Sequence, residues 1–414
     1  MEMMKILGRS WKYINEGNAH IVIELIDTNY VIRLIKLDGK PILIEHIKKS
    51  LHFVNLVMVP ISKNYYYGIG EIAEIPDDDL VKLSQELQQY RPQKRLNKSS
   101  LSPFAIKTTN LSIVSPQCES NYCVEIKPKE GYFASNLKIH SKCYYCIKQY
   151  LKVQTQDIVE TSGYCPLDLF SGDRQRMKKS LFHMIKNPQN NFKLFKDGKL
   201  LYHEKLCNIQ IEDILSDCTQ FESKNVFVNF VVEVLLSEKD KSNNIVKEDT
   251  DIPTSVTKNP CNECNKLKPN NILYTLLELQ KLSEKVTYNS ADITDQHFTY
   301  VQKLLDELSS MSLDLNIEKD RETYLKTANP IHLALISAVA RDCSIMISFS
   351  YDYVANMPFI DVQQKNGSNS RLYYKLTLTD LEPKPIETLL KRKHTERRMI
   401  EAYENAINKE IQCK

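Results

Sequence analysis

The sequence contains few glycines, no long apolar run and no excess of charge of one sign. Only 10 of its 414 residues are glycine, against an average usage near 7%. A glycine beside polar residues is therefore more informative here than in most chains. The longest apolar stretches, residues 51–61 and 226–236, are interrupted and are shorter than the roughly 20 residues of a membrane-spanning helix. We expect no membrane partner.

Charge is almost balanced, with 55 Lys and Arg against 52 Asp and Glu and a net charge of +3. A protein that coats nucleic acid through bulk charge is strongly basic, so we expect no nucleic-acid partner. Any anion-binding site must instead be local. The content of 42% hydrophobic and 26% charged residues is that of a globular protein that folds.

Eleven cysteines, an odd number, are scattered along the chain, which does not fit the disulfide framework of a small secreted protein. The N-terminus "MEMMKILGRSWKY" has no apolar core or small-residue cleavage site of a signal peptide. We therefore expect a protein of the cytoplasm, the nucleus or both.

A chain of 414 residues is too long for one ordinary core, so we expect two or three packed units or one large bilobal domain. Residues 20–26 and 30–35 are β-branched runs around the turn Asp27-Thr28-Asn29, which predicts a hairpin. Residues 171–186, 272–286 and 296–308 have helical spacing, and residues 344–350 and 373–378 resemble strands. Residues 94–110 read as a linker and residues 237–271 as a polar surface insertion. The sequence thus indicates an α+β fold.

The stretch "CVEIKPKEGY" places charged residues on one face of a predicted strand. Glu125, Lys127 and Lys129 alternate in sequence, so in an extended strand they point to the same side. Such a face favours an anionic ligand.

Three further features favour phosphoryl transfer. Gly17 precedes the hairpin and Arg33 lies in its second strand, as in kinase-like folds that cover a nucleotide's phosphates. Asp342 and Asp380 stand at the edges of the two late strands, where carboxylates could hold a metal ion. A plain hairpin with an exposed arginine, and acids that merely form turns, remain alternatives. The P-loop and the HRD and DFG motifs are missing from the sequence, which excludes an ordinary protein kinase.

Ten short blocks follow one another along the chain: "EGNAHIV", "VIRLIK", "YRPQKR", "VEIKPKEGY", "KQYLK", "YCPLDLFSG", "NPQNNFKLFKDG", "LLELQKL", "RDCSIMISFS" and "TDLEPKP". They cover the chain from about Tyr13 to Lys384. In content and order they resemble the blocks of the inositol-pentakisphosphate 2-kinase family.

The resemblance implies ATP- and Mg²⁺-dependent phosphorylation of the 2-hydroxyl of inositol 1,3,4,5,6-pentakisphosphate, giving inositol hexakisphosphate. It implies a bilobal α+β fold distantly related to protein kinases. We expect a mixed β N-lobe over residues 1–120 and an α-rich C-lobe over residues 121–414, with an inositide-binding insertion. We also expect a monomer whose partner is this small-molecule substrate.

Five phosphates carry roughly −8 to −10 at neutral pH, so many cations must converge on the substrate. By resemblance, the substrate-binding residues are Arg95, Lys129, Lys148, Lys152, Asn190, Asn191, Lys384 and Arg392. Lys148 stands where the family has a histidine, and Arg392 is one of several basic residues after "LEPKP".

The resemblance also assigns the reacting and nucleotide-binding groups. Asp342 would accept the proton of the 2-hydroxyl, and Lys127 would bridge the terminal phosphate of ATP and the inositide. Asp380 would hold Mg²⁺, and Glu125 would fix Lys127 or the nucleotide. The residues expected to cover or contact the ATP phosphates are Glu16, Gly17, Asn18 and Arg33. The loop departs from the family at Asn15 and His20.

Two cysteine pairs have the spacing of zinc ligands, Cys143 with Cys146 and Cys261 with Cys264. Each pair supplies only two ligands, and more than a hundred residues separate them. We expect that any structural zinc binds Cys261 and Cys264, because some plant members resemble this pair in carrying a CxxC zinc site. The first pair, in a predicted helix, reads as buried free thiols.

Two other functions remain open. One is an inositide-binding module that has lost activity, although such a module would be expected to lose Asp342 or Asp380. The other is a Mg²⁺-dependent nuclease that combines the E-x-K strand with an upstream acid, for which the candidates are Asp77, Asp78 and Asp79. That reading leaves the glycine loop unused.

Overall fold

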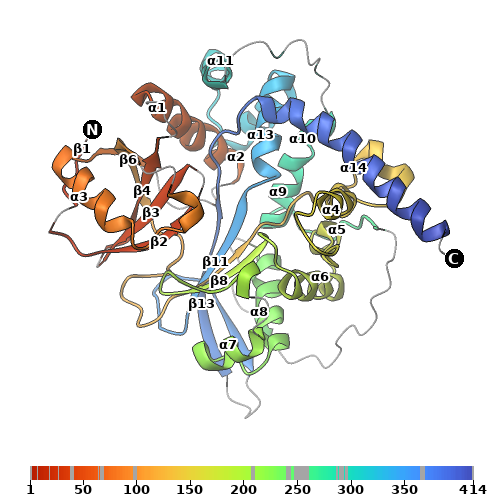
Figure 1. Cartoon of the computed structure of the whole chain (residues 1–414), viewed down its shortest axis with the longest axis horizontal. Helices are drawn as coiled ribbons and strands as arrows, with labels where there is room; N and C mark the ends of the chain where they lie inside the picture. Colours follow the sequence, from red (N-terminus) through yellow and green to blue (C-terminus); the bar gives the residue numbers. More distant parts are fainter. Residues whose placement is uncertain are drawn as a thin grey trace.

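The structure is a computed structural model of the chain. It describes residues 2–6, 8–17, 19–26, 28–37, 42–63, 65, 70–96, 100–206, 210–238, 244–246, 261–285, 288, 293, 297–363 and 369–412. Two sheets and a set of helices make up the fold (Figure 1). The mixed α+β class expected from the sequence is confirmed.

The first sheet has six strands in the order β1-β5-β6-β4-β3-β2, and all its pairs except β1–β5 are antiparallel. Alternate residues of β3 are buried, because one face of the sheet covers a small core with helix α3. The predicted hairpin is confirmed as β3 and β4. The strands are β1 Glu2–Met3, β2 Trp11–Glu16, β3 His20–Leu25, β4 Tyr30–Lys36, β5 Glu71–Glu74 and β6 Leu101–Thr109.

The second sheet has seven strands in the order β10-β12-β13-β11-β7-β8-β9, antiparallel except for the β10–β12 pair. Strand β7 carries the first residues of the "VEIKPKEGY" block and lies between β8 and β11. Both late strands predicted from the sequence are confirmed, as β11 and β13. The strands are β7 Tyr122–Ile126, β8 Phe192–Lys196, β9 Lys199–Tyr202, β10 Asn244–Val246, β11 Ser344–Ser350, β12 Phe359–Gln363 and β13 Asn369–Thr379.

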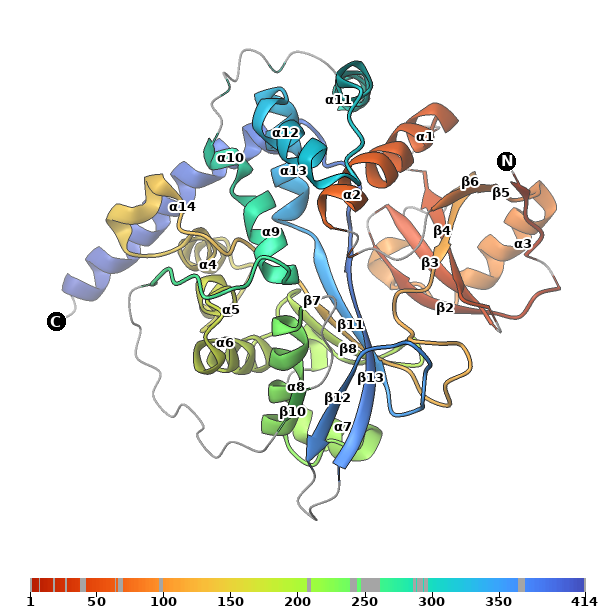
Figure 2. The ribbon, with the colours of Figure 1, turned by 180° about the vertical axis from the view of Figure 1, so that it is seen from behind.

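Helices cover the second sheet, and Figure 2 shows α9, α12 and α13 on the side opposite to the view of Figure 1. The three predicted helical stretches are confirmed in α6, α9 with α10, and α11. The α-helices are α1 Ile44–His52, α2 Val59–Ile61, α3 Asp77–Leu87, α4 Tyr144–Gln154, α5 Pro166–Leu169, α6 Arg174–Lys186, α7 Ile211–Cys218, α8 Lys224–Leu236, α9 Ile272–Gln280, α10 Leu282–Lys285, α11 His297–Met311, α12 Glu318–Thr327, α13 Pro330–Ala340 and α14 Glu387–Gln412. Between them lie the π-helix η1 Phe53–Met58 and the 3-10 helices η2 Gln93–Arg95, η3 Ser135–His140 and η4 Glu204–Leu206.

The larger core lies between the second sheet and its helices. Helices α8 and α13 are apolar on nearly all sides, as expected of helices enclosed by other elements. Phe53 and Val57 of η1 join this core although they come from the N-terminal part of the chain. The long helix α14 packs along α4 (Figure 1).

Two side chains at the end of the expected surface insertion join this core. Cys261 and Leu267 are buried in it, whereas residues 262–266 and 268–270 are exposed or half-buried. Residues 239–243 and 247–260 of the expected insertion lie outside the described residues. No described helix combines the length and apolarity needed to cross a membrane.

Candidate active site

Three strand ends bring the predicted catalytic residues to one edge of the second sheet. Ser344 at the start of β11 pairs with Thr379 at the end of β13, and Ile345 pairs with Ile126 at the end of β7. Asp342 therefore lies just before one strand, while Asp380 and Lys127 directly follow the other two. Sequence neighbours of buried strand residues are held in place by the sheet.

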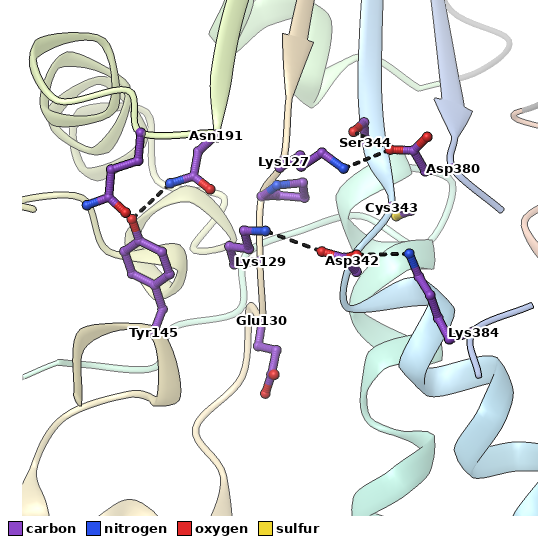
Figure 3. Close-up of polar contacts among 12 residues, drawn as sticks. Lys127, Lys129, Glu130, Tyr145, Asn191, Asp342, Cys343, Ser344, Asp380 and Lys384 are labelled. Atoms are coloured by element: carbon purple, nitrogen blue, oxygen red, sulfur yellow. Dashed lines mark hydrogen bonds and ion pairs between the residues drawn. The ribbon is translucent and has the colours of Figure 1, made fainter. Parts of the chain in front are cut away.

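Lys127 and Asp380 form an ion pair, with Lys127 Nζ 2.7 Å from Asp380 Oδ2 (Figure 3). Burial favours the neutral form of each group, but the opposite charge of its partner outweighs burial. The pKa of Lys127 is raised and that of Asp380 is lowered, the latter also by Arg33 and Lys384. Both groups are therefore charged at neutral pH.

Asp342 lies between two lysines. Its Oδ1 is 3.4 Å from Lys129 Nζ and its Oδ2 is 2.8 Å from Lys384 Nζ, and Figure 3 shows the two lysines approaching from opposite sides. Burial raises the pKa of Asp342, but Lys129 and Lys384 together bring it down to about 2. The side chain is still 51% exposed, so the ion pairs can exchange with a bound ligand.

Glu125 lies beside the Lys127–Asp380 ion pair and has a different partner. Lys193 on β8 donates to Glu125 Oε2 at 2.7 Å. Ser344 Oγ lies 3.1 Å from Glu125 Oε1 and 3.3 Å from Asp380 Oδ2. One buried hydroxyl thus joins two carboxylates, which gives a group of hard oxygen donors of the kind that Mg²⁺ prefers.

The backbone departs from regular strand geometry at two site residues. Lys129 has φ of 58° and Asp380 has φ of 62°, in the left-handed region that residues other than glycine rarely adopt. Strand β7 ends at Ile126, so the prediction that strand alternation aligns Lys129 with Lys127 is wrong. Pro128, which cannot donate to a sheet, and the left-handed turn after it direct Lys129 to Asp342 instead.

Further predicted substrate residues lie on α4 and before β8. Lys152 Nζ donates to Gln189 Oε1 at 2.7 Å, and Asn191 Nδ2 donates to the Tyr145 hydroxyl at 2.9 Å. Burial, and then the positive charges of Lys129 and Lys148, lower the pKa of Lys152. The lysines of α4 therefore lie near enough to Lys129 for their charges to repel one another.

Three other residues predicted to bind the substrate each lie in a separate environment. Asn190 is exposed. Lys148 Nζ lies 5.7 Å from the ring centre of Tyr144. Arg95, at the end of η2, accepts a hydrogen bond from Arg91 through its backbone oxygen at 2.7 Å.

Arg392 makes a buried ion pair. Its Nη1 and Nη2 donate to Glu130 Oε1 and Oε2 at 2.5 and 2.8 Å, and its guanidinium lies 4.2 Å from the ring centre of Tyr144. The structure thus places this predicted substrate residue against Glu130, which points away from Asp342 in Figure 3.

The predicted nucleotide residues lie on the hairpin of the first sheet. Arg33 Nη1 forms an ion pair with Glu382, two residues beyond Asp380, and its Nη2 lies 3.4 Å from His20 Nδ1. This contact links the first sheet to the site at the end of the second. Asn18 lies outside the described residues.

Glu16 has a different environment from the one expected. Its carboxylate accepts from Lys36 Nζ at 2.7 Å and from Arg91 Nε and Nη2, each at 2.9 Å, and its side chain is 0% exposed. Lys36 Nζ also donates to the backbone oxygen of Gly17 at 2.6 Å. The buried Glu16 carboxylate therefore binds Lys36, which also binds the backbone of Gly17, and these contacts stabilise the loop.

Four cysteines from three segments form one cluster. The sulfurs of Cys143, Cys146, Cys165 and Cys261 lie within 4.8 Å of one another, and all four are free thiols. Cys264 is not a member of this cluster. The predicted grouping is therefore corrected: the first CxxC pair provides two members, and Cys165 and Cys261 provide one each.

Sequence reasoning missed several residues of the site, among them Lys36, Lys193, Ser344 and Glu382. Ser344 and Glu382 lie two residues from Asp342 and Asp380, within quoted blocks, so their position was an available signal. Lys36 and Lys193 are also within blocks, but their partners depend on which strands are neighbours. Cys165 gave no spacing signal because it is isolated in sequence.

Comparisons with known proteins agree with this geometry. The inositol-pentakisphosphate 2-kinase of Danio rerio is 26% identical over 454 aligned residues, which cover 94% of this chain and 91% of that protein. Inositol-pentakisphosphate 2-kinases of Oryza sativa subsp. indica and Arabidopsis thaliana are 26% and 24% identical and cover 81% of this chain, with 70% and 73% of their own lengths aligned. The sequence profile of the inositol-pentakisphosphate 2-kinase family matches residues 13–398. The chain belongs to the inositol-pentakisphosphate 2-kinase family.

Proposed function

We propose that this protein transfers the terminal phosphate of ATP to the 2-hydroxyl of inositol 1,3,4,5,6-pentakisphosphate, giving inositol hexakisphosphate. The observation that carries the proposal is the set of lysines around Asp342 and Asp380. Lys127, Lys129 and Lys384 contact these two acids directly. An anionic substrate can replace the carboxylates as the partner of each lysine.

The charge of the substrate explains the surplus of cations. Lys129, Lys148 and Lys152 lie close enough for their positive charges to repel one another, which costs stability. A ligand with roughly −8 to −10 charges removes that repulsion, and each charge-assisted hydrogen bond adds about 1.5 to 3 kcal/mol. Repulsion among these lysines is thus a reason for affinity toward a polyphosphate.

Asp342 acts as the general base in this proposal. While Lys129 and Lys384 hold it, its pKa of about 2 makes it a weak base. When these lysines turn to phosphate oxygens, Asp342 loses its nearest positive charges and its pKa rises. The base would therefore become effective only after the inositide has bound, which couples proton removal to substrate occupancy.

Lys127 would neutralise negative charge that develops during transfer. It directly follows β7, the strand of Glu125, and its ammonium group pairs with Asp380. Asp380, Glu125 and Ser344 supply oxygen donors that fit Mg²⁺, which is usually bound by one or two carboxylates together with substrate phosphates. When bound, the ion would offset negative charge on the nucleotide phosphates. The Ser344 hydroxyl lies within hydrogen-bond distance of both the Glu125 and the Asp380 carboxylates, so it helps to fix their relative position.

The first-sheet hairpin would cover the nucleotide. A Cβ added at Gly17 would meet no atom closer than His20 O at 3.9 Å, and its φ is outside the left-handed region. The fold itself thus gives no reason for glycine there, whereas close approach of a phosphate would.

We propose that residues 1–120 and 121–414 are the N-lobe and C-lobe of a bilobal, kinase-like fold, with the inositide region in the C-lobe. We also propose that the protein acts as a monomer in the cytoplasm or nucleus.

A nuclease is a weaker fit to the same residues. Asp79 is buried on α3, accepts from Ile6 N at 2.6 Å and packs with the first sheet, whereas Glu125 lies on the second. The acids needed beside the E-x-K strand therefore lie on a helix that packs against the other sheet.

The test is product identification after incubation of purified protein with ATP, Mg²⁺ and inositol 1,3,4,5,6-pentakisphosphate. Only the 2-hydroxyl of this substrate is free, so a hexakisphosphate product fixes the position of transfer. Wild type should form it, and the Asp342→Asn variant should not. Binding without product would indicate an inositide-binding module, and no binding would overturn the assignment.

The cysteine cluster fits a structural Zn²⁺ ion. Tetrahedral zinc with Zn–S bonds of about 2.3 Å holds its sulfurs roughly 3.8 Å apart, and Cys165 Sγ lies 3.7 Å from Cys261 Sγ. We propose that Cys143, Cys146, Cys165 and Cys261 bind zinc and anchor residue 261 to α4 and α5.

Metal analysis of purified protein tests this proposal, with one equivalent of zinc expected. Cys165→Ser should lose the metal, whereas the matched control Cys264→Ser should retain it. Equal zinc content in both variants would contradict the four-cysteine site.

A further inference from the structure

The turn that carries Lys129 is held from four directions by side chains distant in sequence. The Tyr164 hydroxyl donates to Pro128 O at 2.6 Å, and Arg392 binds the Glu130 carboxylate. A Cβ at Gly131 would meet Phe170 at 2.2 Å, so only glycine fits there. The fourth contact, from Gln280 at the end of α9, also reaches the neighbourhood of Asp342.

Gln280 makes three side-chain hydrogen bonds to backbone groups. Its Nε2 donates to Lys129 O at 2.8 Å and to Ala340 O at 3.1 Å, while its Oε1 accepts from Gly131 N at 2.9 Å. Both amide protons and the carbonyl oxygen are therefore used. The residue is 0% exposed, and its backbone oxygen accepts from Ser337 Oγ at 2.7 Å.

Ala340 is the last residue of α13 and lies two residues before Asp342. The nitrogen of Asp342 donates to Val339 O at 3.0 Å, so the base is fixed to the same helix end. One buried amide thus joins the backbone of the lysine-bearing turn to the helix that positions the base. A left-handed Lys129 needs such support, because that conformation is strained.

We propose that Gln280 is a positioning residue of the phosphotransfer site, which sets the separation between Lys129 and Asp342. It needs no contact with substrate, because it acts through the two backbone oxygens that it binds. This inference rests on the proposed kinase activity. It implies that a glutamine at the end of an apolar helix controls both substrate affinity and turnover.

The Gln280→Met variant keeps the size of the side chain and removes all three hydrogen bonds. Misplacement of reacting groups by about 1 Å can cost about 100-fold in rate, so we expect kcat/KM for inositol pentakisphosphate to fall about 10- to 100-fold. The KM for ATP should change little, because the described side-chain hydrogen bonds of Gln280 go to Lys129, Gly131 and Ala340 and not to predicted nucleotide residues.

The matched control is Asn271→Leu, at the opposite end of α9. Asn271 is equally buried at 1% exposure and also bonds backbone groups, with Leu273 N donating to its Oδ1 at 2.8 Å and its Nδ2 donating to Leu235 O at 2.6 Å. Both variants should lose thermal stability, but only Gln280→Met should lose kcat/KM at a temperature where both are folded. Equal kinetic losses would reduce Gln280 to a structural role and overturn the inference.

A second variant separates the effect of the hydrogen bond from Gln280 to Lys129 O from that of its hydrogen bond to Ala340 O. In a Lys129→Met protein, adding Gln280→Met should leave the KM for the inositide unchanged while still lowering kcat through Asp342. Identical effects of Gln280→Met on KM in both backgrounds would contradict action through Lys129. If the wild-type protein itself forms no hexakisphosphate, the proposed function fails; if wild type is active and Gln280→Met matches it, only this inference fails.

Discussion

The end of the second sheet and the hairpin of the first both pair acids with cations, but with opposite exposure. Asp342 is half exposed between Lys129 and Lys384, whereas Glu16 is enclosed by Lys36 and Arg91 with none of its side chain exposed. Exposed ion pairs contribute little stability and exchange readily. Removing one partner of a buried pair leaves an unpaired buried charge, which is costly. The first arrangement suits ligand binding, and the second suits structure.

The comparison predicts its largest effect at Asp342. The Asp342→Asn variant keeps the shape of the side chain but cannot accept the proton, so kcat should fall about 10³-fold, within the range of general-base catalysis. Steady-state kinetics would measure this loss. Asp361→Asn is the control, because Asp361 is also an aspartate of the second sheet and pairs with Arg371. A similar loss in both variants would mean that the effect is not specific to the site.

At the buried hairpin pair, the comparison predicts a loss of stability. Glu16→Gln leaves Lys36 and Arg91 without their negative partner, so the free energy of unfolding should fall by about 3 kcal/mol. Denaturant unfolding would measure it, beside Glu45→Gln, which removes an exposed partner of Lys48 and should have almost no effect. If the stability were unchanged and the affinity for ATP were lost, Glu16 would instead contact the nucleotide, as expected from the sequence.

The partly buried pair of Lys127 and Asp380 should matter for rate. Lys127→Met should lower kcat about 100-fold, because a cation aimed at charge that develops during transfer acts mainly on the transition state. The KM for ATP should stay within a few-fold of wild type. A change confined to the KM for ATP would show that Lys127 only binds nucleotide.

The smallest expected effect concerns pH. Lys384 and Lys129 lower the pKa of Asp342 to about 2, so the free protein keeps this carboxylate deprotonated in mild acid. Lys384→Met removes one of these cations and raises the pKa, so the acid limb of the kcat/KM profile should move to higher pH. An acid limb that stays in place would argue that Lys384 does not act on Asp342.

The local pattern predicted several elements but not their partners, and it was wrong for residues 94–110, which read as a linker but contain strand β6. Alternation and turn residues predicted the β3–β4 hairpin, and acids beside apolar runs correctly placed Asp342 and Asp380 at strand ends. The same alternation failed at Lys129, because Pro128 and a left-handed residue end the strand early. Propensity rules do not contain this information, since the turn is held by tertiary contacts.

Pairing across the chain was harder to predict. The cysteine cluster joins residues 143 and 261, and Arg392 joins Glu130 across 262 positions. These contacts follow from the packing of α14 on α4 and of residue 261 against α5. A single sequence shows spacing along the chain, so it reveals CxxC pairs but not that the isolated Cys165 lies beside them.

We expect Lys129 and Lys384 to leave Asp342 when the inositide binds. A crystal structure with inositol pentakisphosphate and an unreactive ATP analogue would show this. Both lysines should then lie on phosphate oxygens, with Asp342 within hydrogen-bond distance of the 2-hydroxyl. Both lysines still paired with Asp342, with the inositide bound elsewhere, would contradict it.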